Sequence, residues 1–233
     1  MIPFDFTVLD LETTGLNPKT DKIIEIGAVR IRGGRIEEQF ESFVNPGRKL
    51  EERIVTLTGI TDAELVTAPV MEEVLPKLLT FIGEDILVGH RILFDYAFVK
   101  RAAVNQKLTF EKQGIDTLKI ARKVLGQLES RKLPDLCEYY RIPHKAHRAV
   151  NDARATAELY RRLAEEFPDE TLYQPQPLIY KAKKDSPITK GQKEQLYKLI
   201  QAHKLVMDCD IDRLTKSEAS RLADKIMLQY GRA

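Results

Sequence analysis

An apolar segment near the N-terminus sets the strongest limit on the fold. Residues 4–11 are almost continuously apolar, which is typical of a strand covered on both faces in a mixed or parallel sheet. We therefore expect this strand at the centre of the sheet. Asp10 and Glu12 stand two residues apart near its C-terminal end, so both side chains project from one face. Open α/β sheets bind ligands at this position, which disfavours the alternative of a solvated acidic pair.

The segments that follow alternate between strand and helix patterns. Two β-branched runs, at residues 23–31 and 36–44, flank a Gly-Gly turn and predict an antiparallel hairpin. We expect Thr117 to cap the helix that begins at residue 118. The element order is β-β-β-α-β-α-β-α-α, an α/β plan with a mixed sheet. The other expected elements are helices over 70–82, 94–104, 118–125, 134–140 and 149–167, and strands over 86–88 and 114–116.

The last quarter of the chain has a different pattern. Four prolines between residues 168 and 187 punctuate a segment without clear periodicity, which predicts a linker. Residues 189–203 form an amphipathic helix candidate, and Thr215 to Glu218 has the capping-box spacing ahead of a second helix that reaches Tyr230. The expected domains are residues 1–167, a linker at 168–188 and a small basic helical domain at 189–233.

Charge is unevenly distributed along the chain. Residues 178–233 hold 12 Lys and Arg against 7 Asp and Glu, or +5, so the rest of a chain with net charge +2 carries −3. A basic tail suits contact with polyanions, and a solvated helical surface is at least as good an interpretation of the tail alone. The tail is thus either an anchor for single-stranded nucleic acid or a helix pair that docks a polymerase or another protein.

Neither a membrane segment nor a disulfide framework is indicated. No apolar run approaches the roughly 18 residues that a membrane span needs, and no basic region precedes an apolar stretch at the N-terminus. We therefore expect a cytoplasmic protein. The only cysteines, Cys137 and Cys209, suggest no thiolate zinc site.

Further candidate groups follow the ends of other predicted elements. Thr13, Thr14 and Gly15 end the first strand with hydroxyls, free amides and a residue without Cβ, which permits close approach of a nucleotide sugar or phosphate. Clustered carboxylates attract Mg²⁺ or Mn²⁺, whereas four scattered histidines do not suggest a zinc cage. Asp95 follows the strand over 86–88, and Asp152 lies five residues after His147 in the first turns of a helix. Taken singly, Asp95 is also a good helix cap, and His147 would more often be a surface histidine.

Together these segments resemble the DEDDh exonucleases, a family that includes proofreading subunits and domains of bacterial DNA polymerase III. Residues 8–16 are similar to its first motif, Phe94-Asp95 with His90 to its second, and residues 147–152 to its third. The resemblance covers about residues 4–167 and departs from the family at Arg91, where many members have Asn. It implies an α/β, ribonuclease-H-like fold with a mixed five-stranded sheet flanked by helices, followed by the small helical C-terminal unit. Secondary similarities occur at residues 24–28, 57–61, 115–118 and 121–122.

The resemblance also implies a two-metal-ion 3′-to-5′ exonuclease that acts on DNA. Asp10, Glu12 and Asp152 would bind the cation that activates water, with Asp95 assisting Asp10 at a second cation, and His147 would take the proton from the attacking water. The expected cofactors are two Mg²⁺ or Mn²⁺ ions per site. The expected partners are nucleic acid, mainly DNA with a free 3′ end, and a DNA polymerase or another replication or repair protein. The residues expected to hold the terminal nucleotide are Thr13, Thr14, Gly15, Leu57, Thr58 and Phe94.

Three alternatives stay open from the sequence. The chain is an exoribonuclease if its contacts select the 2′-hydroxyl. It is a nucleic-acid-binding or polymerase-tethering module if the site is a relict, although all five expected catalytic residues are present. Residues 10–14 are also superficially similar to the nucleophile loop of haloacid-dehalogenase phosphatases, which have Asp where this chain has Glu12.

Overall fold

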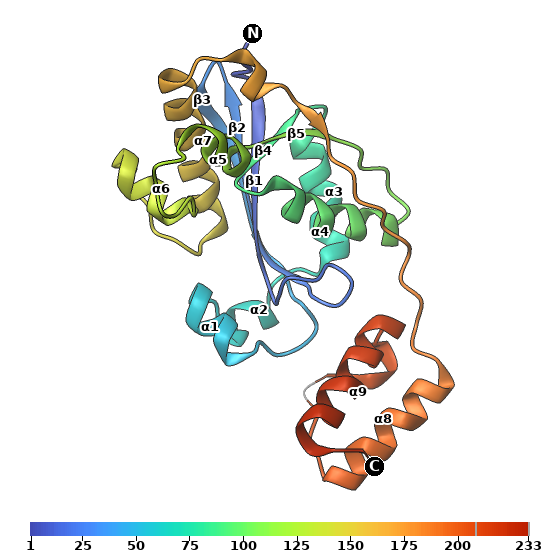
Figure 1. Ribbon diagram of the computed structural model, residues 1–233. Helices are drawn as coiled ribbons and strands as arrows, with labels where there is room; N and C mark the ends of the chain where they lie inside the picture. The colour runs from blue at the N-terminus through green and yellow to red at the C-terminus, as the bar shows by residue number, and fades with distance from the viewer. Residues whose placement is uncertain (208, 233) are drawn as a thin grey trace.

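A mixed six-stranded sheet forms the centre of the molecule (Figure 1). The computed structural model describes residues 1–207 and 209–232. β1 (Phe6–Thr13) lies inside the sheet, antiparallel to β2 (Ile23–Arg32) and parallel to β4 (Leu87–Gly89). The predicted α/β class, the mixed sheet and the interior position of the first strand are confirmed. The strand order is β3-β2-β1-β4-β5-β6, with β3 (Arg35–Phe43), β5 (Gln113–Asp116) and β6 (Gln176–Pro177).

The prediction of five strands is wrong, because β6 was missed. This two-residue strand pairs antiparallel with β5, inside the segment expected to be a linker. The 3-10 helix Glu170–Tyr173 lies there as well, and the buried ring of Tyr173 packs edge-on against Tyr160, with 5.5 Å between ring centroids. A proline is compatible with β6 because an edge strand leaves one row of amides unpaired. The division of the chain into domains stays a prediction.

The helices agree with the predicted ones in number and order after residue 70. Two short helices before that point, α1 and α2, were missed because 5 to 7 residues carry too little periodicity to recognise. The predicted cap of α5 is wrong: the Asp116 side chain accepts from the amides of Leu118 and Lys119, and Thr117 is the first helical residue. The helices are α1 (Glu52–Thr58), α2 (Asp62–Val66), α3 (Met71–Ile82), α4 (Ile92–Asn105), α5 (Thr117–Val124), α6 (Leu133–Tyr140), α7 (Ala149–Glu166), α8 (Lys190–His203) and α9 (Lys216–Tyr230).

Two hydrophobic layers cover the two faces of the sheet. Phe6 and Val8 belong to the layer that includes residues of α5, α6 and α7, whereas Leu9 and Leu11 belong to the layer that includes residues of α3 and α4. Side chains alternate between faces along a strand, so Asp10 projects on the same face as Val8. The catalytic candidates of β1 therefore face α7.

The two C-terminal helices form a separate small core. α8 and α9 pack together through buried residues that include Leu196, Leu199 and Ile226, at the end of the molecule opposite the N-terminus (Figure 1). Thr189 and Thr215 each form the reciprocal hydrogen bonds of a capping box, which confirms both predicted helix starts. Within the described residues, no helix combines the length and the apolar character that crossing a bilayer requires.

Candidate active site

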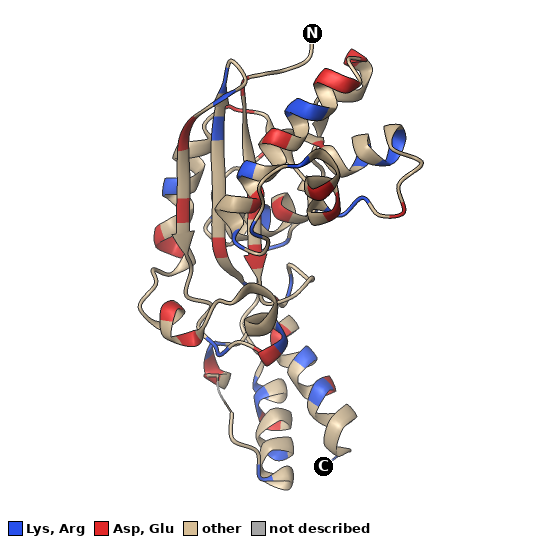
Figure 2. Cartoon of the chain, turned by 90° about the vertical axis from the view of Figure 1, so that its left-hand side faces the viewer, with Lys and Arg blue, Asp and Glu red and all other residues tan. Residues whose placement is uncertain are grey.

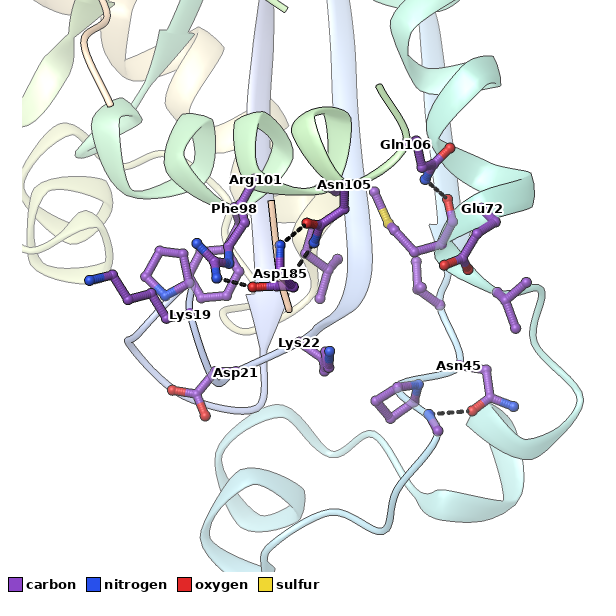
Figure 3. Close-up of a pocket in the computed structure, with 18 of the residues that line it drawn as sticks. Lys19, Asp21, Lys22, Asn45, Glu72, Phe98, Arg101, Asn105, Gln106 and Asp185 are labelled. Atoms are coloured by element: carbon purple, nitrogen blue, oxygen red, sulfur yellow. Dashed lines mark hydrogen bonds and ion pairs between the residues drawn. The ribbon is translucent and has the colours of Figure 1, made fainter. Parts of the chain in front are cut away.

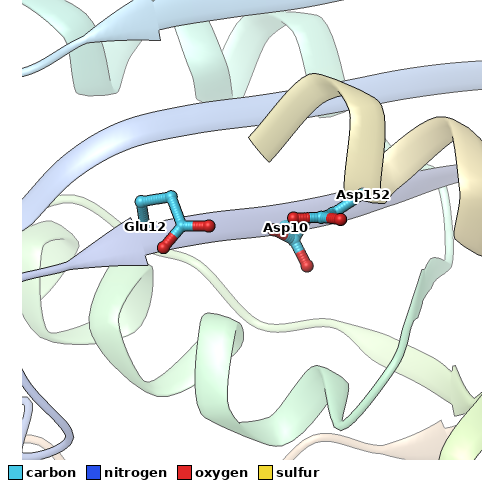
Figure 4. A group of neighbouring side chains, drawn as sticks. All are labelled: Asp10, Glu12 and Asp152. Atoms are coloured by element: carbon cyan, nitrogen blue, oxygen red, sulfur yellow. The ribbon is translucent and has the colours of Figure 1, made fainter. Parts of the chain in front are cut away.

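Three carboxylates converge where β1 meets the start of α7 (Figure 4). One side-chain oxygen from each of Asp10, Glu12 and Asp152 lies within 4.8 Å of the other two. Asp10 and Glu12 come from β1, and Asp152 comes from the first turn of α7. Residues more than 140 positions apart in the sequence therefore form a single cluster of oxygen ligands.

A fourth carboxylate, Asp95, completes this cluster from the first turn of α4. The backbone amide of Leu11 donates to Asp95 Oδ1 over 3.1 Å, which ties the start of α4 to β1. All four carboxylates line one cavity of about 230 Å³, together with His147 and Phe94. The structure thus brings together every residue that was predicted to be catalytic. The cavity is also lined by Leu11, Leu16, His90, Arg91, Leu133, Pro134 and Ala146.

The electrostatics of this cluster favour a bound cation. Burial, reinforced by the neighbouring carboxylates, raises the pKa of Asp10 well above its ordinary value. Burial, with Asp152 next in importance, raises the pKa of Glu12 to about 8, and burial raises that of Asp95. Like charges buried together are stable only when protons or cations neutralise them. Carboxylate oxygens are the ligands that hard divalent cations prefer, so the donor set fits such ions.

Glu25 of β2 holds the start of α7 in place. Its side chain is fully buried; one oxygen accepts from Arg148 Nε and the other from the amide of Ala149, each over 3.0 Å. A carboxylate at a helix N-terminus also interacts favourably with the helix dipole. A Cβ on Gly27 would lie only 2.1 Å from the backbone carbon of Ala149, so a glycine is required for this close approach. The position of Asp152 therefore depends on β2 as well as on its own helix.

Comparison with known proteins identifies the family. The model of the exonuclease family of the RNase T type matches residues 7–160, which is well over half of the chain. The chain is 40% identical over 164 residues to the DNA polymerase III subunit epsilon of Aquifex aeolicus, covering 70% of this chain and 81% of that subunit. The chain belongs to the DEDDh exonucleases. This confirms the predicted family and the enzyme class.

Two further similarities concern the sequence and the fold, respectively. A PolC-type DNA polymerase III of Caldanaerobacter subterraneus subsp. tengcongensis is 43% identical over 165 residues; the match covers 70% of this chain and only 12% of that polymerase. The nuclease domain of 3′hExo, a DEDDh family member bound to rAMP, has a TM-score of 0.62 at 21% identity, covering 74% of this exonuclease and 96% of that chain. The latter likeness confirms the predicted fold.

Two histidines of the exonuclease lie beside Asp152, and one of them was not predicted. The backbone amide of His147 donates to Asp152 Oδ2 over 2.9 Å, and His147 adopts a left-handed conformation with φ of 63°. The imidazole that contacts Asp152 is that of His144, through Nε2 and Oδ1. The sequence shows His144 three residues before His147, but its contact with Asp152 forms only in the folded chain. The role of His147 as general base stays a prediction.

The six residues expected to hold the nucleotide occupy different surroundings. Of these six, all within the described residues, Phe94 is the one that lines the cavity. The Thr13 hydroxyl donates to the carbonyl of Gly15, and the Thr58 hydroxyl donates to that of Ile54. Leu57, at 51% exposure, lies on α1 with its side chain available for contacts. Their binding roles stay predictions.

The backbone conformation at Arg91 explains why many family members have Asn at this position. Arg91 precedes α4 with φ of 80°, a left-handed conformation that Asn adopts more readily than Arg, which accounts physically for the Asn of many family members. Its amide donates to Asp116 Oδ1 over 3.0 Å, and its guanidinium lies 5.7 Å from the centroid of the Phe94 ring. A strained residue with a cationic side chain therefore stands at the wall of the catalytic cavity.

His90 has a structural environment in the same wall. Its Nε2 faces the carbonyl of Arg131 at 2.8 Å, so this nitrogen carries the proton, and Nδ1 accepts from the Thr117 hydroxyl at 2.9 Å. Burial lowers the pKa of His90, which keeps the ring neutral. His90 thereby fixes the segment around residue 131 against the turn that precedes α4, the helix that carries Asp95.

Proposed function

We propose that this exonuclease removes nucleotides in the 3′-to-5′ direction from DNA, single-stranded or frayed, and releases nucleoside monophosphates. The observation that carries the proposal is the convergence of four carboxylates, from β1, α4 and α7, in one cavity. The match to a chain named subunit epsilon of DNA polymerase III supports DNA as the substrate, and proofreading or repair as its setting. It likewise supports association with a DNA polymerase or another replication or repair protein.

The donor set suits two divalent cations, Mg²⁺ or Mn²⁺. We assign Asp10, Glu12 and Asp152 to one ion, and Asp10 with Asp95 to the other. When bound, such a pair stabilises the attacking and leaving oxygens of an in-line phosphodiester displacement. The hydrogen bonds that the backbone amides of Leu11 and His147 donate to Asp95 and Asp152 keep these two carboxylates oriented toward the cavity.

The remaining roles fall to residues around the same cavity. His147 takes the proton from the attacking water, since an imidazole titrates close to neutral pH and His147 lines the cavity with the carboxylates. Phe94 offers an aromatic surface to the terminal nucleotide. We assign further contacts with that nucleotide and its free 3′-hydroxyl to five residues that do not line the cavity: Thr13, Thr14, Gly15, Leu57 and Thr58.

The test is digestion of 5′-labelled single-stranded DNA and RNA of equal sequence, with Mg²⁺ or Mn²⁺ and with EDTA. Wild type is compared with Asp10→Asn and with Asp224→Asn, which makes the same change at an exposed position of α9. A second pair of substrates carries a 3′-phosphate in place of the 3′-hydroxyl, to test the need for a free end.

We expect a ladder that shortens from the 3′ end of DNA, requires the metal and persists in Asp224→Asn but not in Asp10→Asn. A ladder on RNA that is faster than on DNA would move the assignment to an exoribonuclease. Binding without cleavage of either polymer would contradict the enzymatic proposal and favour a binding or tethering module.

A further inference from the structure

The loop that leaves the catalytic strand is closed on itself by hydrogen bonds. This catalytic loop, residues 14–22, follows Asp10 and Glu12 directly, and its residue Leu16 lines the catalytic cavity. The amide of Thr14 donates to the Lys22 carbonyl and the amide of Lys22 donates to the Thr14 hydroxyl, both over 2.9 Å. The two ends of the loop are therefore fixed to each other.

Asp21 is the anchor inside the catalytic loop. Its side chain is 3% exposed, and its Oδ2 accepts from the amide of Asn17 over 2.9 Å. A Cβ on Gly15 would meet the Asp21 carboxylate at 2.5–2.9 Å, so this carboxylate packs directly against the backbone of Gly15. A displacement of Asp21 would consequently displace the segment that joins β1 to Leu16.

Two arginines from outside the loop neutralise Asp21. Arg48 lies 3.5 Å from Oδ1 and also donates to the Thr14 hydroxyl over 2.6 Å. Arg221, in α9 and 200 residues away in the sequence, donates from Nη1 to Asp21 Oδ1 and to the Thr20 hydroxyl, each over 2.5 Å. The shorter of the two ion pairs therefore comes from the C-terminal helices.

Further ion pairs join the same two parts of the molecule. Lys22 of the catalytic loop pairs with Glu218 of α9 at 2.8 Å. Burial alone would raise the pKa of Glu218, but the Lys22 ammonium and the hydrogen bonds from Thr215 outweigh it and lower that pKa. Lys225 of α9 pairs with Glu51, next to α1, at 3.0 Å. Lys and Arg also recur along the C-terminal helices where they approach the body (Figure 2).

A tether and a cavity lie beside these contacts. Asp185, in the segment that leads to α8, pairs with Arg101 of α4 and accepts from Asn105 Nδ2 over 2.7 Å. Figure 3 shows these bonds across a cavity of about 410 Å³ from Asp21 and Lys22. The helices are thus attached to the body on both sides of this cavity.

We propose that α9 is a positioning element for the exonuclease site: Arg221, through Asp21, holds the catalytic loop in the conformation that receives the terminal nucleotide. The proposal rests on the proposed function for its catalytic readout. Without Arg221, Asp21 retains only the more distant guanidinium of Arg48, and the loop then samples conformations in which Gly15 and Leu16 leave their places. Arg221 touches no reacting atom, so its effect is on substrate binding.

The kinetic test compares full-length Arg221→Ala with wild type on single-stranded DNA at saturating Mg²⁺. Because the loop contributes binding present in both ground and transition states, KM should rise roughly 5- to 20-fold, with kcat changed less than about threefold. Arg232→Ala is the matched control, since it removes the same charge from the same part of the chain just after α9. It should retain wild-type values, and Arg221→Lys should recover part of the loss in KM.

A second readout does not require nuclease activity. Hydrogen exchange should be faster in Arg221→Ala at the amides of Thr14, Asn17 and Asp21, with the protection of α8 and α9 unchanged. If Arg221→Ala loses the helices, Arg221→Gln, which retains a donor for the Thr20 hydroxyl, replaces it in both assays.

The outcomes separate the two proposals. Unchanged KM and unchanged exchange in the loop, in a variant whose wild-type parent is active, would overturn the positioning role of Arg221. A wild type without nuclease activity would refute the proposed function, and the exchange experiment would still decide whether α9 holds the catalytic loop.

Discussion

Two groups of buried carboxylates in this molecule differ in what neutralises them. Asp21 is enclosed by two guanidinium groups, from Arg48 and Arg221. In the catalytic cavity, no ion pair within the described residues reaches Asp10, Glu12 or Asp95. Burial is the main cause of the raised pKa values of these three carboxylates, whereas arginines of the chain supply the counter-charges of Asp21.

We interpret this difference as that between a structural carboxylate and carboxylates that bind a cation. Burying a charge is tolerated when a partner is supplied, and the partner at Asp21 is part of the fold. Around Asp10, Glu12 and Asp95 the chain supplies mainly repulsion, so the neutralising charge must be a proton or an external cation. Metal binding and stability should therefore be linked in the cavity, and substitutions in either group test this link.

The largest effect is expected on catalysis. Asp10→Asn removes a charged ligand that we assign to both cations, so we expect kcat/KM to fall by at least about 10³-fold. Stabilisation of transition-state charge by bound metal contributes several kcal/mol, and each loss of about 1.4 kcal/mol lowers the rate tenfold. Asp21→Asn should lower kcat/KM far less, mainly through KM. Measured rates on the 5′-labelled DNA decide the point; equal losses in the two variants would contradict the distinction between the groups.

The same isosteric change should have opposite effects on stability in the absence of metal. Asp10→Asn removes repulsion and should raise the free energy of unfolding by about 1–2 kcal/mol. Asp21→Asn leaves two arginines without their counter-charge and should lower it by about 2 kcal/mol, or roughly 4–8 °C in Tm. Thermal unfolding in EDTA measures both, with Asp224→Asn as the control. Shifts of the same sign would show that both carboxylates play one structural role.

The pH dependence of stability should reveal the contribution of the cavity carboxylates. The pKa of Glu12 is raised from 4.5 to about 8 on folding, so the folded protein binds this proton more tightly than the unfolded chain. The resulting contribution to the free energy of unfolding is fully present below pH 4.5 and is lost as pH rises through about 8. Without metal, Tm should therefore fall from pH 5 to 8, and Glu12→Gln should reduce this slope. With Mg²⁺ the slope should flatten or reverse, because cations displace protons from the carboxylates as pH rises. Parallel curves with and without Mg²⁺ would exclude the cavity as the metal site.

The two groups were not equally visible in the sequence. Asp10, Glu12, Asp95 and Asp152 each stand at the end or start of a predictable element, in motifs that resemble a known family, so local patterns were enough to find them. Asp21 gave no such signal, because what defines it is an arginine 200 residues later. Pairing across that distance depends on how the helices dock, which periodicity does not encode.

The fold was predictable to a similar degree. The central strand, the hairpin and the long helices follow from periods of 2 and 3.6 residues, whereas β6 exists because β5 offers it an edge. Glu25 illustrates an intermediate case. It lies in a segment similar to the family, but its function as the anchor of α7 depends on contacts with Arg148 and Ala149 that only the folded chain makes. His144 was missed for the same reason.

The smallest effects are expected from substitutions of two arginines with left-handed backbones, one in the cavity wall and one outside it. Arg91 has φ of 80° and lines the cavity, whereas Arg141 has φ of 54° at the end of α6 and does not line it. Replacing either with Asn, which tolerates this conformation better, should raise the free energy of unfolding by about 0.5–1 kcal/mol.

Activity should separate these two substitutions. Arg91→Asn removes a cation beside Phe94 and should raise KM for DNA by roughly 2- to 5-fold, with a weaker dependence of KM on salt, since each lost phosphate contact lowers the salt slope. Arg141→Asn should leave KM unchanged. Steady-state rates at several salt concentrations measure the difference. If both variants gain stability and keep wild-type KM, the charge of Arg91 does not act on the substrate, and its strained backbone serves the α4 start alone.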